Sequence, residues 1–184
     1  MKQVFSHAAQ ENKTRELVTA ALFCALLCVI APITIPLSSG VGITLSVLGV
    51  FLVAVFCRPR WAVMAIVCYL ALGFLGVPVF SGWRGGADVL FGLTGGFIWS
   101  YIPMALMVSA AAKTKRTWLV ALSMVGALAV CYACGTVWFV WAGHSSWKAA
   151  LTACVVPFIP IDLAKAAAAL VLYRTKNALF SARS

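Results

Sequence analysis

One stretch decides how the rest of this chain is interpreted: Val156-Pro157-Phe158-Ile159-Pro160-Ile161-Asp162-Leu163-Ala164-Lys165. It lies in an apolar run over residues 149–173, long enough to cross a bilayer as a helix. Near its centre an acid and a base stand three residues apart, which places them on one helix face with Cβ atoms about 5–6 Å apart. The two prolines disturb the helix and free carbonyl groups, which need a partner or must line a cavity enclosed by protein.

The pair Asp162 and Lys165 allows two interpretations. A charge at the middle of a membrane helix costs ~2.5–3.5 kcal/mol, so an ionisable residue there is a functional-site hypothesis by default. We favour a polar ligand site inside a membrane protein. The alternative is a self-paired couple that only holds helices together.

The composition is that of a membrane protein. Of the 184 residues, 64% are hydrophobic and 10% are charged, whereas a soluble domain has roughly 45–50% apolar and about 25% charged residues. The formal net charge of +10 is also a feature of nucleic-acid-binding proteins. Here, however, the basic residues stand in short runs between apolar spans, which is typical of topology signals and contacts with anionic lipids. We therefore expect membrane lipids, and no nucleic acid, as partners.

The apolar segments predict an all-α polytopic membrane protein, with one integral membrane domain over residues 1–184. Each segment has about the length that a bilayer crossing requires, and short turns join them. The six expected transmembrane helices are 17–35, 41–57, 61–77, 89–112, 118–143 and 149–173. A tight turn is expected at Ser38-Ser39-Gly40.

The distribution of Lys and Arg predicts the orientation of these helices. Most of them lie in the N-terminal lead, the turn at 58–60, the loop at 113–116 or the C-terminal tail. The exceptions are Arg84, Lys148 and Lys165. Because basic loops stay in the cytoplasm, both termini and these two basic loops are expected there. The loops at 36–40, 78–88 and 144–148 then face outward.

The sequence offers little for catalysis or metal binding. It has no G-x-x-x-x-G-K-[ST] motif, so it does not bind ATP by that loop. Its two histidines, His7 and His144, are expected to be solvated. The seven cysteines lie in or beside apolar spans, where cysteine packs as a small hydrophobe, and Cys131-x-x-Cys134 lacks further zinc ligands nearby. We expect no metal, no cofactor and no enzymatic activity. The alternative of a membrane enzyme would use Asp162 as a base.

A glycine-rich and aromatic loop precedes the fourth span. It reads Gly73-Phe74-Leu75-Gly76-Val77-Pro78-Val79-Phe80-Ser81-Gly82-Trp83-Arg84-Gly85-Gly86-Ala87-Asp88. Glycine permits backbone conformations closed to other residues, and loops on rigid scaffolds often carry function. We favour a lid or pocket wall, with Arg84 as an outward cation, over a flexible outer turn.

Two pairs of small residues suggest close helix packing. Gly92 and Gly96 form a G-x-x-x-G, and Ala21 and Ala25 form an Ala-x-x-x-Ala in the first span. Small residues at this spacing allow another helix to approach closely. Helix packing is the favoured interpretation of the glycine pair.

Three blocks of residues resemble the BioY family, the substrate-binding subunits of energy-coupling-factor transporters for biotin. Pro36 and Thr44, around the start of the second span, form the first block. The two more specific blocks are Gly73-x-x-Gly76-x-Pro78-Val79-Phe80 through Gly85-Gly86 and Thr94-Gly95-Gly96-Phe97, and Pro157-Phe158-x-Pro160-x-Asp162-x-x-Lys165. The resemblance extends over nearly the whole chain.

The resemblance implies a six-helix subunit of the bacterial inner membrane that captures biotin outside the cell. It implies a transmembrane coupling subunit and a pair of cytosolic ATPases as partners, and it also allows function without them, as a homo-oligomer. We expect the coupling subunit to contact Ala21 and Ala25. The residues expected to bind the substrate are Asp162, Lys165, Arg84, Phe80, Trp83, Thr94 and Gly95.

The chemistry of biotin suits these residues. Small-molecule pockets are mostly apolar with a few placed polar groups, and an ionised Asp162 can accept charge-strengthened bonds from the two ureido N–H groups. Lys165 is expected to meet the ureido carbonyl or the carboxylate, with Arg84 as the second candidate for the carboxylate. Phe80 and Trp83 would cover the rings. A carrier for another vitamin-like solute and a purely structural subunit remain the alternatives.

Overall fold

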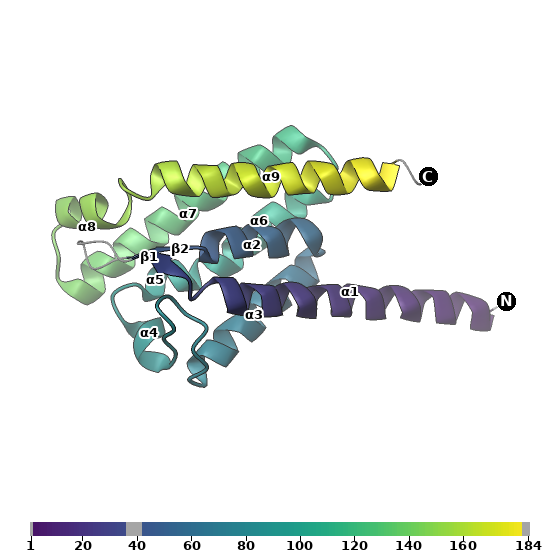
Figure 1. Ribbon diagram of the computed structural model, residues 1–184, viewed down its shortest axis with the longest axis horizontal. Coiled ribbons are helices and arrows are strands. Elements are labelled where there is room, and N and C mark those ends of the chain that lie inside the picture. Colours follow the sequence, from purple (N-terminus) through teal and green to yellow (C-terminus); the bar gives the residue numbers. More distant parts are fainter. Residues whose placement is uncertain (1, 36–41, 182–184) are drawn as a thin grey trace.

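Helices lying side by side along one long axis make up this protein (Figure 1). The structure is a computed structural model, and it describes residues 2–35 and 42–181. The elements are, in chain order, α1 (Lys2–Ile30), β1 (Thr34–Ile35), β2 (Ile43–Thr44), α2 (Ser46–Phe56), α3 (Pro59–Phe74), α4 (Ala87–Phe91), α5 (Gly95–Trp99), α6 (Tyr101–Ala112), α7 (Thr117–Gly143), α8 (Trp147–Cys154) and α9 (Ile159–Ser181). The all-α class is confirmed, with one addition: β1 and β2 form a short antiparallel pair. The turn expected at Ser38–Gly40, together with Pro36, lies outside the described residues.

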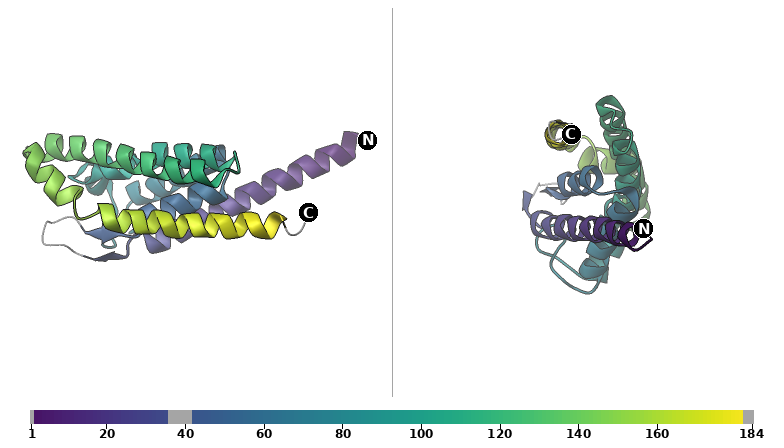
Figure 2. Two further views of the ribbon diagram at one scale, coloured as in Figure 1. Left: turned by 90° about the horizontal axis from the view of Figure 1, so that it is seen from above. Right: turned by 90° about the vertical axis from the view of Figure 1, so that its right-hand side faces the viewer.

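The molecule has two distinct ends (Figure 1). The start of α1 and the end of α9 lie at one end, where the first turns of α1 project beyond the other helices (Figure 2). The strand pair, the loop before α4, and α8 lie at the other end. The chain therefore begins and finishes on the same side, as the predicted orientation requires. Which compartment that side faces stays a prediction.

Helix α2 forms the centre of the core. Nine of its residues are buried: Ser46, Val47, Gly49, Val50, Phe51, Leu52, Val53, Ala54 and Val55. A helix that is apolar all round is expected to be enclosed by others, and α1, α6 and α9 pack against α2. At Gly49 an added Cβ would collide with the side chain of Leu27 on α1, so glycine permits the close approach of these two helices.

Several predicted spans are interrupted. The first expected span reaches 35, but α1 ends at Ile30, just before Pro32, because proline disfavours helix at the preceding residue. The second expected span begins at 41, but α2 begins only at Ser46 because β2 occupies its first part. The fourth is divided into α4, α5 and α6, and Gly92 interrupts the helix between α4 and α5 with φ −76° and ψ −173°.

The sixth span is also broken, as its prolines suggest. Helices α8 and α9 are bent by 45° relative to each other around the break at 155–158. Pro157 lies in that break. Pro160 lies in the first turn of α9, where backbone N–H groups make no hydrogen bond within the helix, so proline is tolerated there. The fifth span is continuous, and α7 covers it completely.

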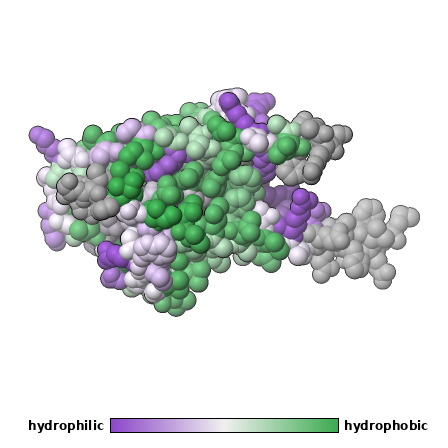
Figure 3. All heavy atoms as spheres, in the orientation of Figure 1, coloured by the Kyte–Doolittle hydropathy of each residue, from purple (hydrophilic) through white to green (hydrophobic). Residues whose placement is uncertain are grey.

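An apolar belt separates the two polar ends of the molecule (Figure 3). Among the described residues, the segment Gly95–Ala112 and helix α7 are long and apolar enough to cross a membrane alone, and the bent pair α8–α9 makes a third crossing if counted as one. Helices α2 and α3 are apolar but shorter. The chain is therefore a helical membrane protein, while the exact number of six crossings stays a prediction.

Candidate functional site

The break before α9 positions its two charged residues. Asp162 lies in the first turn of α9, where its backbone N–H donates to the Phe158 carbonyl at 2.8 Å. A carboxylate is stabilised at this end of a helix, because the unpaired N–H groups there carry partial positive charge. Lys165 follows one turn later on the same face, so both side chains point toward the interior of the bundle.

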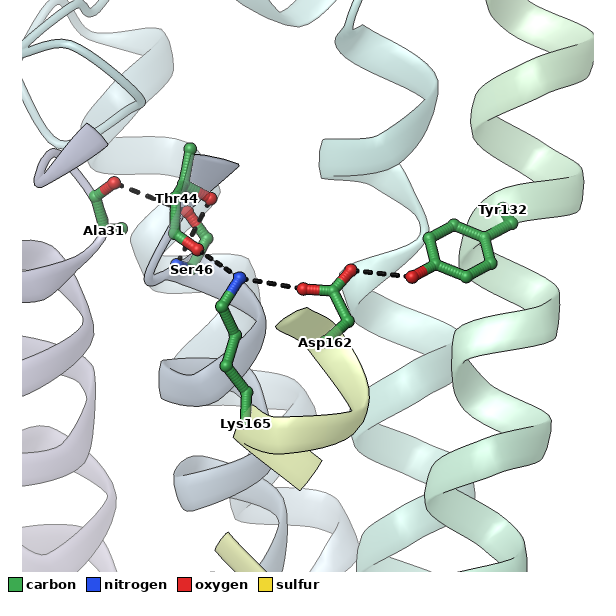
Figure 4. A network of polar contacts seen from close by, with 6 residues as sticks. All are labelled: Ala31, Thr44, Ser46, Tyr132, Asp162 and Lys165. Atoms are coloured by element: carbon green, nitrogen blue, oxygen red, sulfur yellow. Dashed lines mark hydrogen bonds and ion pairs between the residues drawn. The ribbon is translucent and has the colours of Figure 1, made fainter. Parts of the chain in front are cut away.

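Asp162 and Lys165 form a buried ion pair (Figure 4). Lys165 Nζ lies 2.7 Å from Asp162 Oδ1, and the two side chains are 8% and 4% exposed. The ammonium group also donates to the backbone carbonyl of Thr44 on β2 at 2.6 Å. The pair therefore connects α9 to the strand that precedes the central helix, two segments 121 residues apart in the chain.

The second oxygen of Asp162 is bound from another helix. Tyr132 on α7 donates its hydroxyl to Asp162 Oδ2 at 2.8 Å (Figure 4). Each carboxylate oxygen thus has one protein donor, and each retains capacity for a further hydrogen bond. Donors from α7 and α9 hold the carboxylate, and β2 holds the ammonium that pairs with it.

A cavity of about 160 Å³ opens beside this carboxylate. Its wall combines many apolar and aromatic side chains with a small number of polar ones, which is the usual character of a small-molecule pocket. The lining residues are Gly42, Thr44, Ser46, Val47, Tyr69, Phe80, Ser81, Arg84, Val89, Thr94, Phe97, Ile98, Tyr101, Cys131, Tyr132, Cys154, Phe158 and Asp162. Asp162 is buried at this wall, whereas the side chain of Arg84 is 63% exposed. An anionic group therefore lies inside the cavity and a cationic group at its exposed rim.

The glycine-rich loop covers the cavity as a short hairpin. Phe80 and Arg84 exchange two backbone hydrogen bonds, of 2.9 and 3.3 Å. The turn between them uses left-handed conformations at Gly82 and Trp83, with φ values of 71° and 59°. Phe80 is buried, and its ring meets the ring of Tyr69 edge to face at 5.5 Å between centroids.

The tip of this loop is attached to β1. Thr34 Oγ1 lies 2.9 Å from Ser81 Oγ and accepts from the Gly82 N–H at 3.0 Å. The same N–H also approaches the Pro32 carbonyl, at 3.1 Å. The loop is therefore an ordered wall of the cavity in this structure. Whether it moves when a ligand binds stays a prediction.

Four of the residues expected to bind substrate line the cavity: Asp162, Arg84, Phe80 and Thr94. The other three lie elsewhere. The ammonium of Lys165 lies between the Asp162 carboxylate and the Thr44 carbonyl and bonds to both. Trp83 is 63% exposed, because the left-handed turn places it on the outside of the hairpin.

Gly95 is the third residue that the structure does not place on the cavity wall. It is buried between α4 and α7, where an added Cβ would collide with the Leu90 carbonyl. The neighbouring Gly96 lies against Cys134 and Trp138 on α7. This contact agrees with helix packing as the role of the second glycine in the G-x-x-x-G.

Three tyrosines in the cavity wall were not expected from the sequence: Tyr69, Tyr101 and Tyr132. The signal that could have identified them is their position within apolar spans, because a buried tyrosine hydroxyl usually requires a hydrogen-bond partner. Tyr69 donates to the Val79 carbonyl at 3.0 Å, at the start of the hairpin. Two of the wall tyrosines thus contact polar groups that shape the cavity.

The expected contact face of the first helix lies on the surface. Ala21 and Ala25 are both exposed on α1, beside the exposed side chain of Leu22. The surface that Ala21 and Ala25 form is therefore accessible to a helix of another protein.

Comparison with known proteins decides the family. The model of the BioY family matches residues 2–182. The chain belongs to the BioY family. Two similar relatives are the biotin transporter BioY of Thermotoga maritima, 38% identical over 166 residues, and the biotin transporter BioY2 of Lactococcus lactis, 36% identical over 160 residues. The first alignment covers 89% of this chain and 96% of the relative, and the second covers 85% and 87%.

The fold of this BioY family member is also found in a solved structure. That structure is the S-component for biotin from an ECF-type ABC transporter. The two superpose with a TM-score of 0.83 over 91% of this chain and 93% of the other, at 21% sequence identity. At this identity the similarity concerns the fold, and it supports the arrangement of broken helices described above.

Proposed function

We propose that this BioY family member binds biotin in the cavity beside Asp162 and mediates its uptake across the membrane. The observation that carries this proposal is the position of Asp162. Its carboxylate is buried at the wall of a largely aromatic cavity, and each of its oxygens can accept one more hydrogen bond. The chain belongs to a family whose relatives are named biotin transporters.

The geometry supports one orientation of the ligand. The ureido group of biotin carries N–H donors, and the Asp162 carboxylate has free acceptor capacity for such a donor. The apolar rings would lie against Phe80 and Tyr69. The carboxylate tail would extend toward the exposed rim, where Arg84 lies. Lys165 then acts by holding the Asp162 carboxylate in position.

We propose that a transmembrane coupling subunit of an energy-coupling-factor module, with its cytosolic ATPases, supplies the energy for uptake in the bacterial inner membrane. The exposed Ala21 and Ala25 face of α1 supports this assignment, since small side chains allow a second membrane helix to pack closely. Function as a homo-oligomer is the alternative arrangement.

Calorimetric titration of the purified protein with three compounds tests the proposed ligand. Biotin carries both recognised groups, lipoate carries a carboxylate tail without a ureido group, and biotin methyl ester carries a ureido group without a carboxylate. We expect tight binding of biotin, no measurable binding of lipoate, and weaker binding of the ester. Binding of lipoate as tight as that of biotin would favour a carrier for another vitamin-like solute.

A further inference from the structure

A second hollow lies at the opposite end of the molecule, beside the chain termini. It has a volume of about 1110 Å³ and lies where the ends of α2 and α6 meet the last part of α9. Four cations from three separate segments line it, and we name it the basic groove: Arg58, Lys113, Lys115 and Lys176. Polar residues gather at this end beyond the apolar belt (Figure 3). The basic groove is thus a cationic hollow at the edge of the membrane-facing surface.

Three of the four cations of the basic groove make no ion pair with any described residue. Among the described side chains that line it, none is a carboxylate. The nearest described acid, Glu16 on α1, is already occupied, because it pairs with Arg58 at 2.9 Å and accepts from Trp61 Nε1 at 2.8 Å. An adjoining hollow shares Arg58 and Lys176 and adds a further cation, Arg15. The local charge therefore favours binding of an anion.

Lys176 is held at the inner wall of the basic groove. Its ammonium donates to the Val55 carbonyl at 3.0 Å and lies 4.9 Å from the centre of the Phe56 ring. It makes no ion pair with any described residue. At the end of α6, Tyr173 Oη donates to the Ala112 carbonyl at 3.1 Å. The carbonyl groups of Val55 and Ala112, which would repel an anion, thus already accept hydrogen bonds. The Lys176 ammonium can still donate further hydrogen bonds.

We propose that the basic groove binds the phosphate headgroup of an anionic phospholipid from the leaflet at the terminus end. Basic pockets between transmembrane helices bind such headgroups because each Lys or Arg near the surface attracts anionic lipid. The apolar residues beside the cations, among them Val55 and Phe56, offer a surface for the first acyl carbons. Topology signalling alone requires only basic loops. It does not account for a lysine on the last helix that reaches the end of α2.

Native mass spectrometry of the full-length protein in mild detergent tests this site. The protein is mixed with equimolar phosphatidylglycerol and phosphatidylcholine, and bound lipid is counted for each. The variants are Lys176→Gln and the double variant Lys113→Gln/Lys115→Gln in the exposed turn. Lys148→Gln, an exposed lysine at the other end, is the matched control. Circular dichroism and elution volume confirm that each variant is folded.

The parent protein is expected to retain phosphatidylglycerol in preference to phosphatidylcholine. Each lost cation should weaken this binding by about fivefold, while Lys148→Gln should leave it unchanged. A large excess of inorganic phosphate should not displace the lipid. Equal retention of both lipids, unchanged binding in both test variants, an equal loss in the control, or displacement by phosphate would each overturn the proposal.

Discussion

The hydroxyl of Tyr132 on α7 donates to Oδ2 of Asp162 on α9 at 2.8 Å, across 30 residues of sequence. The bond fixes the one carboxylate of the cavity from a second helix while Lys165 fixes its other oxygen. The orientation of the Asp162 carboxylate is therefore set by the packing of α7 against α9 as well as by the sequence around Asp162 itself.

Substitution Tyr132→Phe removes this donor and keeps the ring. Hydrogen bonds between membrane helices contribute about 0.6 kcal/mol on average, so biotin affinity should fall about threefold as the carboxylate loses its orientation. Tyr173→Phe is the matched control, because that hydroxyl contacts only the Ala112 carbonyl at the other end. Titration of both variants with biotin measures the effect. An equal change in biotin affinity in the two variants would show that the Tyr132 hydroxyl does not orient the Asp162 carboxylate for binding.

The hairpin over the cavity should become more protected from hydrogen exchange when biotin binds. Substitution Thr34→Val removes the oxygen that contacts Ser81 and the Gly82 N–H, so the tip of the loop loses its attachment to β1. We expect faster exchange of the amides at 80–84 and faster dissociation of biotin from this variant. Thr175→Val, at an exposed position on α9, is the control. Unchanged protection of the parent loop at saturating biotin would contradict a lid.

Gly96 should tolerate no side chain, because an added Cβ would collide with Trp138 Cβ and lie 2.8 Å from the Cys134 carbonyl. Overpacking of this kind costs typically about 1–3 kcal/mol, and Gly96→Ala should lower the thermal unfolding midpoint accordingly. Gly126→Ala is the control, since its Cβ would make only an ordinary contact with Met107 at 3.5 Å. Equal midpoints for both variants would show that α5 and α7 do not depend on this close approach.

The Ala21 and Ala25 face should matter for uptake and not for binding. Ala25→Trp fills a surface that is exposed in this chain, so a coupling subunit could no longer pack closely there. We expect ATP-dependent biotin uptake by cells to be lost while the purified variant binds biotin as the parent does. Ala129→Trp, on the exposed side of α7, serves as control. Equal loss of binding and uptake in Ala25→Trp would identify the face as internal packing.

Local sequence was sufficient for the parts of the site that depend on one segment. The spacing of Asp162 and Lys165 predicted that they share one helix face, and the ion pair between them was the alternative to a direct contact of both with the ligand. The prolines predicted the break that places them at the start of α9. The glycine-rich composition of 73–88 likewise indicated a structured loop beside the cavity.

Other features depend on contacts between distant segments, and the sequence could not reveal them. Lys165 was expected to meet the ligand, and that contact stays a prediction; the sequence did not reveal that its ammonium also donates to the Thr44 carbonyl, 121 residues away. Tyr132 lies among apolar residues of α7, and only the packing of that helix gives its hydroxyl a partner. Trp83 was expected to cover the ligand, and that contact stays a prediction; the sequence did not reveal its left-handed backbone conformation or the 63% exposure of the residue.

The central claim is that the Asp162 carboxylate recognises the ligand, and the biotin affinity of Asp162→Asn tests it most directly. The substitution keeps the volume of the side chain and removes its charge. A hydrogen bond to a charged group contributes about 1.5–3 kcal/mol, so the dissociation constant should rise roughly tenfold to a hundredfold. Asp88→Asn, at an exposed residue 3.2 Å from Arg84, should bind biotin at least as tightly as the parent. If Asp162→Asn and Lys165→Gln both fold and bind biotin with parental affinity, the pair only holds helices together and the site lies elsewhere.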